Sequence, residues 1–128
     1  MKEKIIVTAS VFGVLAVIAG AFGAHSLQGD LSAKNLEVWH TAVEYQFFHV
    51  FAILFLSTLT RFKIKLINEC YYLFSLGIIC FSGSLYLLAC RDLLGWNWLS
   101  IIGPLTPLGG LLFIAGWLAL GVAAYKHK

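Results

Sequence analysis

Four long apolar runs, separated by short polar segments, organise this chain. They cover residues 5–24, 41–60, 70–89 and about 101–124. A helix of about 20 residues is about 30 Å long, which matches the hydrocarbon core of a bilayer. The pattern therefore predicts one domain over residues 1–128, an all-α membrane protein folded as a bundle of four transmembrane helices.

Composition supports a membrane protein and excludes the other broad classes. Apolar residues make up 60% of the chain, charged residues only 12%, and the mean hydropathy is +0.87. A soluble domain has about 25% charged residues, and a disordered chain has few apolar ones. The first run also has the features of a signal peptide, with Ala19-Gly20-Ala21 as a cleavage site, but we expect it to remain as a helix because it is long enough to span.

The positive charges predict the orientation. Lys34 and Arg91 lie in the first and third connections, and the other seven Lys and Arg residues lie at the termini and in the second connection: Lys2, Lys4, Arg61, Lys63, Lys65, Lys126 and Lys128. Short cytoplasmic segments are enriched in these residues, so both termini are predicted to be cytoplasmic. The net charge of +3 then reflects topology, and we expect no nucleic-acid partner.

Small residues and two prolines give clues to packing. Ala and Gly recur at four-residue spacing in the first run and again in the fourth, which favours close helix contacts within the chain or between subunits. Pro104 and Pro107 stand at the outer end of the fourth run. Pro104 is predicted to open that helix. The alternative is a helix break whose freed backbone groups line a cavity, as in transporters.

The second run carries polar residues at membrane depth, where they are costly and often functional. On a helical projection one face is small or hydrogen-bonding and is predicted to face inward, whereas the phenylalanines face lipid or a partner subunit. Serines of the third run share one face with Tyr86. The candidate binding residues are Thr41, Tyr45, Gln46, His49, Ser82 and Tyr86. They predict either a grip on a ligand or a set of hydrogen bonds that tie the helices together.

A second polar cluster is predicted at the outer end, formed by His25, His40 and Glu44. Glu44 lies one turn from His40, which favours an interfacial i, i+4 pair. A metal site made by these three residues would have an unusual spacing, so no metal and no cofactor are expected. Cys70, Cys80 and Cys90 are too far apart on a helix to form a disulfide. Nucleophile motifs and phosphate loops are absent from the sequence, so no catalytic residue is assigned.

Four segments resemble a known family. They are Gly20-Ala-Phe-Gly-Ala-His25, Thr41-Ala-Val-Glu-Tyr-Gln-Phe-Phe-His49, Phe81-Ser-Gly-Ser-Leu-Tyr86 and Gly103-Pro-Leu-Thr-Pro-Leu-Gly-Gly110. They are similar to the uncharacterised small inner-membrane proteins that include bacterial YgdD and YwdK and are related to eukaryotic transmembrane protein 256. The resemblance implies a four-helix protein of the inner (plasma) membrane and brings no agreed activity.

Two functions are compatible with these features. The first is a small oligomeric module that binds a membrane lipid or another amphipathic molecule between helices or subunits. The second is a structural or assembly role, in which the chain forms a homo-oligomer or docks another membrane protein without ligand chemistry. A metal-dependent membrane enzyme is the least favoured alternative.

Overall fold

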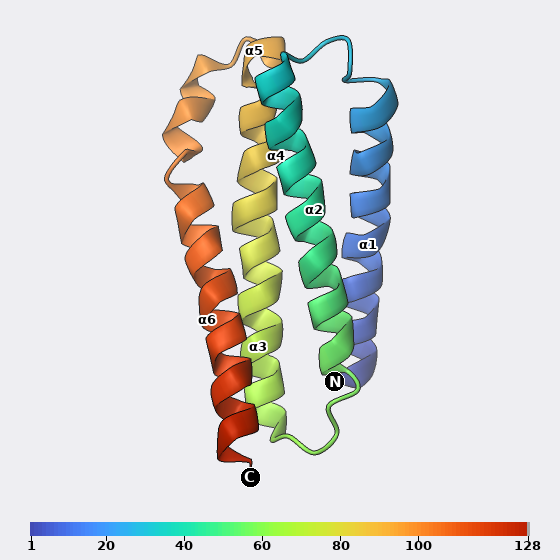
Figure 1. Ribbon diagram of the computed structural model, residues 1–128, viewed down its shortest axis with the longest axis vertical. Helices are drawn as coiled ribbons and strands as arrows, with labels where there is room; N and C mark the ends of the chain where they lie inside the picture. The colour runs from blue at the N-terminus through green and yellow to red at the C-terminus, as the bar shows by residue number, and fades with distance from the viewer. Residues whose placement is uncertain (128) are drawn as a thin grey trace.

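The computed structural model describes residues 1–127, and every regular element in that part of the chain is helical. The elements are α1 (Lys2–His25), α2 (Ala33–Leu56), α3 (Ile64–Gly77), the π-helical segment η1 (Ile78–Ser82), α4 (Gly83–Ala89), the short α5 (Arg91–Leu94), the 3₁₀ segment η2 (Asn97–Ile102) and α6 (Leu105–Lys126). The predicted all-α class is confirmed. Long helical segments stand side by side, and both termini lie at the same end of the molecule (Figure 1).

Three helical segments are long and apolar enough to cross a membrane: Lys2–His25, Ile64–Ala89 and Asn97–Lys126. The second of these joins α3, η1 and α4 into one column, and the third joins η2 and α6. Helix α2 is as long as α1 but is not among them. Its apolar run is interrupted by the polar side chains between His40 and His49.

Two helices begin earlier than their apolar runs. Helix α2 begins at Ala33 and not near residue 41, because the hydroxyl of Ser32 caps it by accepting a hydrogen bond from the Asn35 amide at 3.1 Å. Helix α3 begins at Ile64 and not at residue 70. Backbone hydrogen bonding does not stop where the hydrocarbon core ends, so polar residues extend both helices beyond the runs that hydropathy detects.

Helix α1 packs almost entirely against α2. Its small residues form the contact: Ala9 and Ala16 are buried, and a Cβ added at Gly20 would lie 3.6 Å from Val43 of α2. The small-residue row of the first run therefore faces a neighbouring helix of the same chain. Close backbone approach of this kind is how helices associate in lipid, where the hydrophobic effect gives no net attraction between them.

Helices α3 and α6 interlock through two phenylalanines. Phe74 of α3 covers Gly116, where an added Cβ would lie 2.6 Å from the ring. Phe113 of α6 covers Gly77 in the same way. Each ring occupies the space that a side chain on the facing glycine would need, so the pair fixes the register of the two helices. In the fourth run, the small-residue row only partly faces this contact, because Ala115 is exposed.

Pro104 immediately precedes α6 as its N-cap residue, and Pro107 lies in its first turn. Proline is tolerated at these positions because the first amides of a helix have no intrahelical acceptor. The preceding 3₁₀ segment ends at Gly103, whose amide donates to Ser100. The column therefore changes from 3₁₀ to α geometry at Gly103-Pro104, and a regular α-helix starts there.

The connection that follows α4 holds the Arg91–Asp92 pair, whose Nε and Oδ1 atoms are 3.7 Å apart. Asn35 of α2 donates to the same carboxylate at 3.1 Å, so this turn is joined to the start of α2. Helix α5 ends at Gly95, which has φ 67°. A residue with a Cβ would be strained there.

Candidate functional site

Helix α2 separates a polar interior face from a phenylalanine face. Gln46 and His49 are buried on the interior side, whereas Phe48 and Phe51 are more than half exposed. This agrees with the helical projection. Tyr45 is the exception, since it was predicted to point inward and is 39% exposed. Its ring instead lies at the edge of an aromatic cluster that includes Phe81 and Phe113.

The first polar contact ties three helices together at Gln46. The amide nitrogen of Gln46 donates to the carbonyl oxygen of Phe12 in α1 at 2.8 Å. Its amide oxygen accepts from the Tyr86 hydroxyl of α4 at 2.6 Å. The Trp39 ring lies 4.7 Å from that of Tyr86, and its indole nitrogen donates to the carbonyl of Ala19 at 2.8 Å. Because α1 meets α3 and α4 only weakly elsewhere, these bonds help to hold α1 in place.

The second contact joins α2 to the end of the π-helical segment. The Ser82 hydroxyl is fully buried and donates to the carbonyl of Ala42 at 2.8 Å. Nearby, the Ser84 hydroxyl lies 2.6 Å from that of Thr106, which links α4 to the first turn of α6. Both serines are thus committed to partners on other helices.

The third contact is centred on His49. The indole nitrogen of Trp117 donates to Nε2 at 3.1 Å, and Nδ1 lies 2.8 Å from the carbonyl oxygen of Tyr45. Since an indole only donates and a carbonyl only accepts, these neighbours require a neutral imidazole with its proton on Nδ1. The ring also stacks on Phe113, with centroids 3.5 Å apart. Both nitrogens are occupied, so His49 connects α2 to α6 and has no free group for a ligand.

The predicted binding residues therefore do not form one network. Gln46 and Tyr86 lie together, whereas Ser82 and His49 make separate contacts. Thr41 bonds within its own helix, to the carbonyl of Glu37 at 3.1 Å. The hydroxyl of Ser75, which the sequence placed on the same face as Ser82, is buried and has no partner among the described residues.

The outer-end residues His25, His40 and Glu44 are all exposed. No ion pair joins His40 to Glu44 in the part of the chain that the structure describes, so the expected i, i+4 pair is not formed. Within residues 1–127, no three His, Cys, Asp or Glu side chains converge closely enough to hold a metal ion. The three outer-end residues are therefore separate surface groups. The three cysteines are free thiols.

An apolar groove of roughly 560 Å³ runs between α1 and the column of α3, η1 and α4. Helix α2 forms its floor with Trp39 and Gln46, and Tyr86 lies beside them. Apart from these few polar groups, the walls of the groove are apolar. They are formed by Phe12, Leu15, Ile18, Ala19 and Phe22 from α1 and by Ile78, Ile79 and Gly83 from the opposite column. The groove exists because α1 packs on α2 and leaves its other side open.

The π-helical segment lies along this groove. The Gly83 amide donates to the carbonyl of Ile78, five residues earlier, which defines the wider π turn. Such turns occur often at functional sites, because an extra residue shifts the side chains of one helical face relative to the next. A Cβ added at Gly83 would meet nothing within 4 Å, so this glycine leaves open space in the groove wall.

Sequence reasoning missed several of these residues. Trp39 was not among the candidate residues, yet its indole nitrogen donates to the carbonyl of Ala19 inside the protein. Trp117 lies near the middle of the fourth run, away from the interfaces where Trp is usual, and this position was a signal for an internal partner. Phe12 contributes only its backbone carbonyl to the Gln46 contact, so its side-chain type carries no signal.

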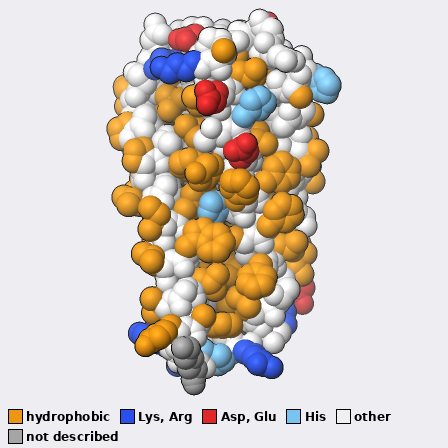
Figure 2. All heavy atoms as spheres, in the orientation of Figure 1, with side chains coloured by type: hydrophobic (Ala, Val, Ile, Leu, Met, Phe, Trp, Pro, Cys, Tyr) orange, Lys and Arg blue, Asp and Glu red, His pale blue; other side chains and the backbone are white. Residues whose placement is uncertain are grey.

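On the face shown in Figure 2, the surface between the two ends is largely hydrophobic, and most of the charged side chains lie toward the ends. Together with the spanning helices, this surface defines an all-helical integral membrane protein. Residues 19–110 match the model of a family described as a protein of unknown function, DUF423. The chain belongs to this family, as its four motifs indicated.

Three curated relatives carry the same description and match this chain over most of their length. The chain is 42% identical to a UPF0382 membrane protein of Staphylococcus haemolyticus, with 88% of each chain covered. It is 40% identical to the UPF0382 membrane protein YwdK of Bacillus subtilis, over 95% of this chain and 96% of the relative. A Haemophilus influenzae UPF0382 membrane protein is 38% identical over 100% of this chain and 98% of its own length. No solved structure matches the chain significantly.

Proposed function

We propose that this protein crosses the inner membrane four times, with both termini in the cytoplasm, and holds one acyl chain of a membrane lipid in the groove between α1 and the α3–η1–α4 column. The apolar groove with its small polar floor is the observation that carries the lipid-binding part. The proposal assigns no catalytic step to the chain.

The four-span topology is supported by geometry and charge. Helix α2 runs alongside α1 over 24 residues, which is long enough to cross the hydrocarbon core (Figure 1). Its buried polar side chains, Gln46 and His49, find partners on α1, α4 and α6, so these two residues do not prevent it from spanning. Both termini lie at the end that also carries the connection with Arg61, Lys63 and Lys65.

Reporter fusions test this topology. A fluorescent protein fused after residue 128 or inserted at residue 60 is expected to fluoresce, because both sites are cytoplasmic in the proposal. Alkaline phosphatase inserted at residue 29 or at residue 95 is expected to be active, since it requires the outer compartment. Active phosphatase at residue 60 would contradict the four-span topology, because that connection would then lie outside.

Lipid binding is supported by the size and chemistry of the groove. Its volume of roughly 560 Å³ falls in the range of small-molecule sites, about 300–1,000 Å³. An apolar wall facing the bilayer core offers acyl chains dispersion contacts on several sides, which a flat helix surface does not. Gln46 and Tyr86 already bond to each other, so they close the floor and leave its contact with the lipid mainly apolar.

A leucine at Gly83 tests the proposal. Gly83 lines the groove and nothing lies within 4 Å of an added Cβ, so a leucine at this position is expected to occupy groove space. The Gly83→Leu protein is expected to retain less than about a fifth of the lipid that the wild type carries through delipidation, measured by native mass spectrometry. The leucine takes the place of part of the acyl chain and removes its dispersion contacts with the groove, and a loss of about 1 kcal/mol is about fivefold in binding.

Gly121→Leu is the matched control. It makes the same substitution at another helical glycine with open space around it, but outside the groove. This variant is expected to retain lipid as the wild type does. Equal lipid retention in both variants would contradict the groove as the binding site.

A structural role in an assembly is the second candidate. It is favoured by the exposed phenylalanines of α2, Phe48, Phe51 and Phe55, which form a row on one helical face. A symmetric homo-oligomer would bury this row against a second copy of the chain, and a mixed assembly would bury it against another membrane protein. The same native mass spectra separate the two functions, because a defined oligomer with only exchangeable lipid would favour assembly.

A further inference from the structure

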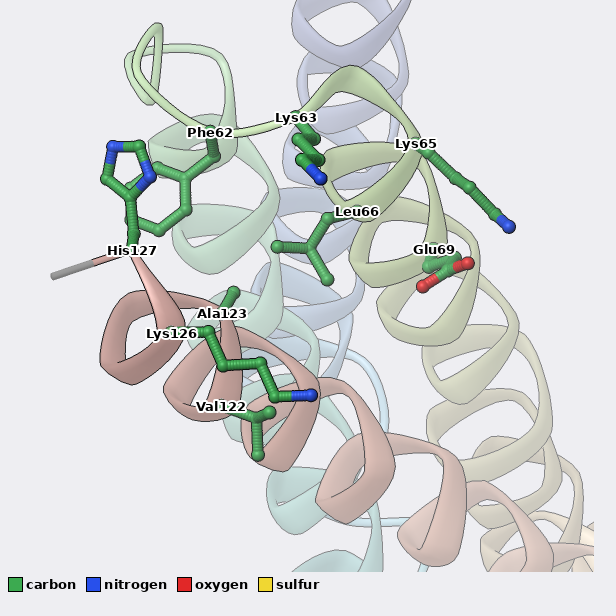
Figure 3. Close-up of a pocket in the computed structure, with 9 residues that line it drawn as sticks. All are labelled: Phe62, Lys63, Lys65, Leu66, Glu69, Val122, Ala123, Lys126 and His127. Atoms are coloured by element: carbon green, nitrogen blue, oxygen red, sulfur yellow. The ribbon is translucent and has the colours of Figure 1, made fainter.

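A second hollow lies at the end of the molecule that carries both termini, between the start of α3 and the end of α6 (Figure 3). Its volume is roughly 540 Å³. Apolar side chains form much of its lining, including Leu66 of α3 and Val122 of α6. It is separate from the groove described above, with which it shares no lining residue.

Positive groups surround this hollow. Lys63 precedes α3 and Lys126 closes the last turn of α6, and both extend their ammonium groups toward the space between the helices (Figure 3). Lys65 points away from α6. Glu69 is the one carboxylate among the lining residues, and no ion pair joins it to Lys63 or Lys126 within residues 1–127. Neither ammonium group therefore has an acidic partner among the described residues.

Helix α3 adds a further positive contribution. The first amides of a helix have no intrahelical acceptor, and the helix dipole favours anions at this end. Helix α3 has no side-chain cap at its first residue. The helix follows Lys63 directly in the sequence, so its N-terminal end adds to the positive potential at this end of the molecule.

We infer that this hollow binds one anionic phospholipid, with the phosphate of its headgroup between Lys63 and Lys126 and the start of an acyl chain on Leu66 and Val122. The occupant is a lipid because the cations form the rim and apolar side chains form the floor, an arrangement that matches an amphipathic anion. Basic pockets between helices at the cytoplasmic surface are suited to such headgroups. The inference does not depend on the groove between α1 and α4.

Lipid titrations of the full-length protein test the inference. Dioleoyl phosphatidylglycerol or dioleoyl phosphatidylcholine is added to detergent-solubilised protein, and bound lipid is counted by native mass spectrometry. One phosphatidylglycerol is expected to bind in preference to phosphatidylcholine. The double substitution Lys63→Gln/Lys126→Gln is expected to weaken phosphatidylglycerol binding about thirtyfold, since each lysine near a membrane anion contributes about 1 kcal/mol and about 1.4 kcal/mol corresponds to a tenfold change.

The matched control is Lys2→Gln/Arg61→Gln. It also removes two positive charges from this end of the molecule, but neither residue lines the hollow. It is expected to leave phosphatidylglycerol binding within about twofold of the wild type. An equal loss in both double variants would overturn the inference, because it would indicate diffuse attraction to the whole basic end. Equal binding of phosphatidylglycerol and phosphatidylcholine by the wild type would overturn the inference as well.

A third variant tests the apolar floor. Val122 is 50% exposed, so Val122→Trp fills the hollow without displacing a buried neighbour. It keeps every positive charge and is expected to weaken phosphatidylglycerol binding at least fivefold. Unchanged binding in this variant, or displacement of the lipid by soluble glycerol phosphate at equal concentration, would contradict an acyl-anchored lipid. Loss of the groove-bound lipid in Gly83→Leu with an intact phosphatidylglycerol titration would separate the two sites.

Discussion

Replacing Gly109 by alanine is expected to lower the free energy of unfolding by about 3 kcal/mol, the upper part of the usual range for overpacking. An added Cβ at this position would lie 2.7 Å from both Cα and Cβ of Phe81 and would also meet its backbone amide nitrogen. Because the obstacle is mainly backbone, no rotamer change can relieve the clash. Helix α6 would have to move away from the π-helical segment.

Gly121→Ala is the control for this prediction. Gly121 lies on the same helix, and an added Cβ there would meet nothing within 4 Å. Alanine is favoured over glycine in a helix by about 0.5–1 kcal/mol, so this variant is expected to be as stable as the wild type or slightly more stable. Unfolding in mixed micelles with increasing sodium dodecyl sulfate provides the comparison. A similar stability of the two variants would contradict the close contact at Gly109.

His49→Ala is expected to cost about 3 kcal/mol of unfolding free energy. The substitution removes a buried ring that stacks on Phe113 and leaves a cavity. It also removes the acceptor of the Trp117 indole, and an interhelical hydrogen bond in a membrane protein contributes about 0.6 kcal/mol on average. Packing therefore accounts for most of the expected loss.

Phe48→Ala separates this effect from general loss of aromatic surface. Phe48 is adjacent in sequence and has a larger apolar side chain, but it is 56% exposed on the outward face of α2. Its truncation is expected to change stability by less than about 0.5 kcal/mol in the same micelle titration. If Phe48→Ala proved as damaging as His49→Ala, the interior assignment of His49 would be wrong.

The all-helical class could be predicted from the sequence because apolar runs of bilayer length leave few other folds. The interior face of α2 could be predicted too, since Gln46 and His49 alternate with the phenylalanines at helical period. The early starts of α2 and α3 were missed because hydropathy detects the hydrocarbon core, whereas the Ser32 cap and backbone bonding determine helix ends. Whether small residues face the same chain or another depends on three-dimensional packing.

The candidate site was less predictable. Helical spacing brought Gln46 and Tyr86 correctly into the same region, but it also grouped them with His49, whose partner Trp117 lies on another helix and another side of α2. The groove results from the position of α1 relative to α4, which no local pattern encodes. The π turn at Ile78–Ser82 is equally hidden, since no proline marks it.

Photolabelling is the most direct test of the central claim that an acyl chain occupies the groove. The protein is placed in nanodiscs of phosphatidylcholine containing a small fraction with a diazirine in the acyl chain, and adducts are mapped by mass spectrometry. Leu15 and Ile79 line the groove, whereas Val14 and Leu118 lie outside it with similar exposure, 50% and 57% against 59% and 63%.

The proposal predicts several-fold more adducts on Leu15 and Ile79 than on Val14 and Leu118, and loss of this excess in Gly83→Leu. An acyl chain held in the groove stays in contact with the groove residues, whereas the residues outside the groove contact only lipids that exchange rapidly with the bulk bilayer. Adducts in proportion to exposure at all four positions, unchanged in Gly83→Leu, would contradict a lipid held in the groove.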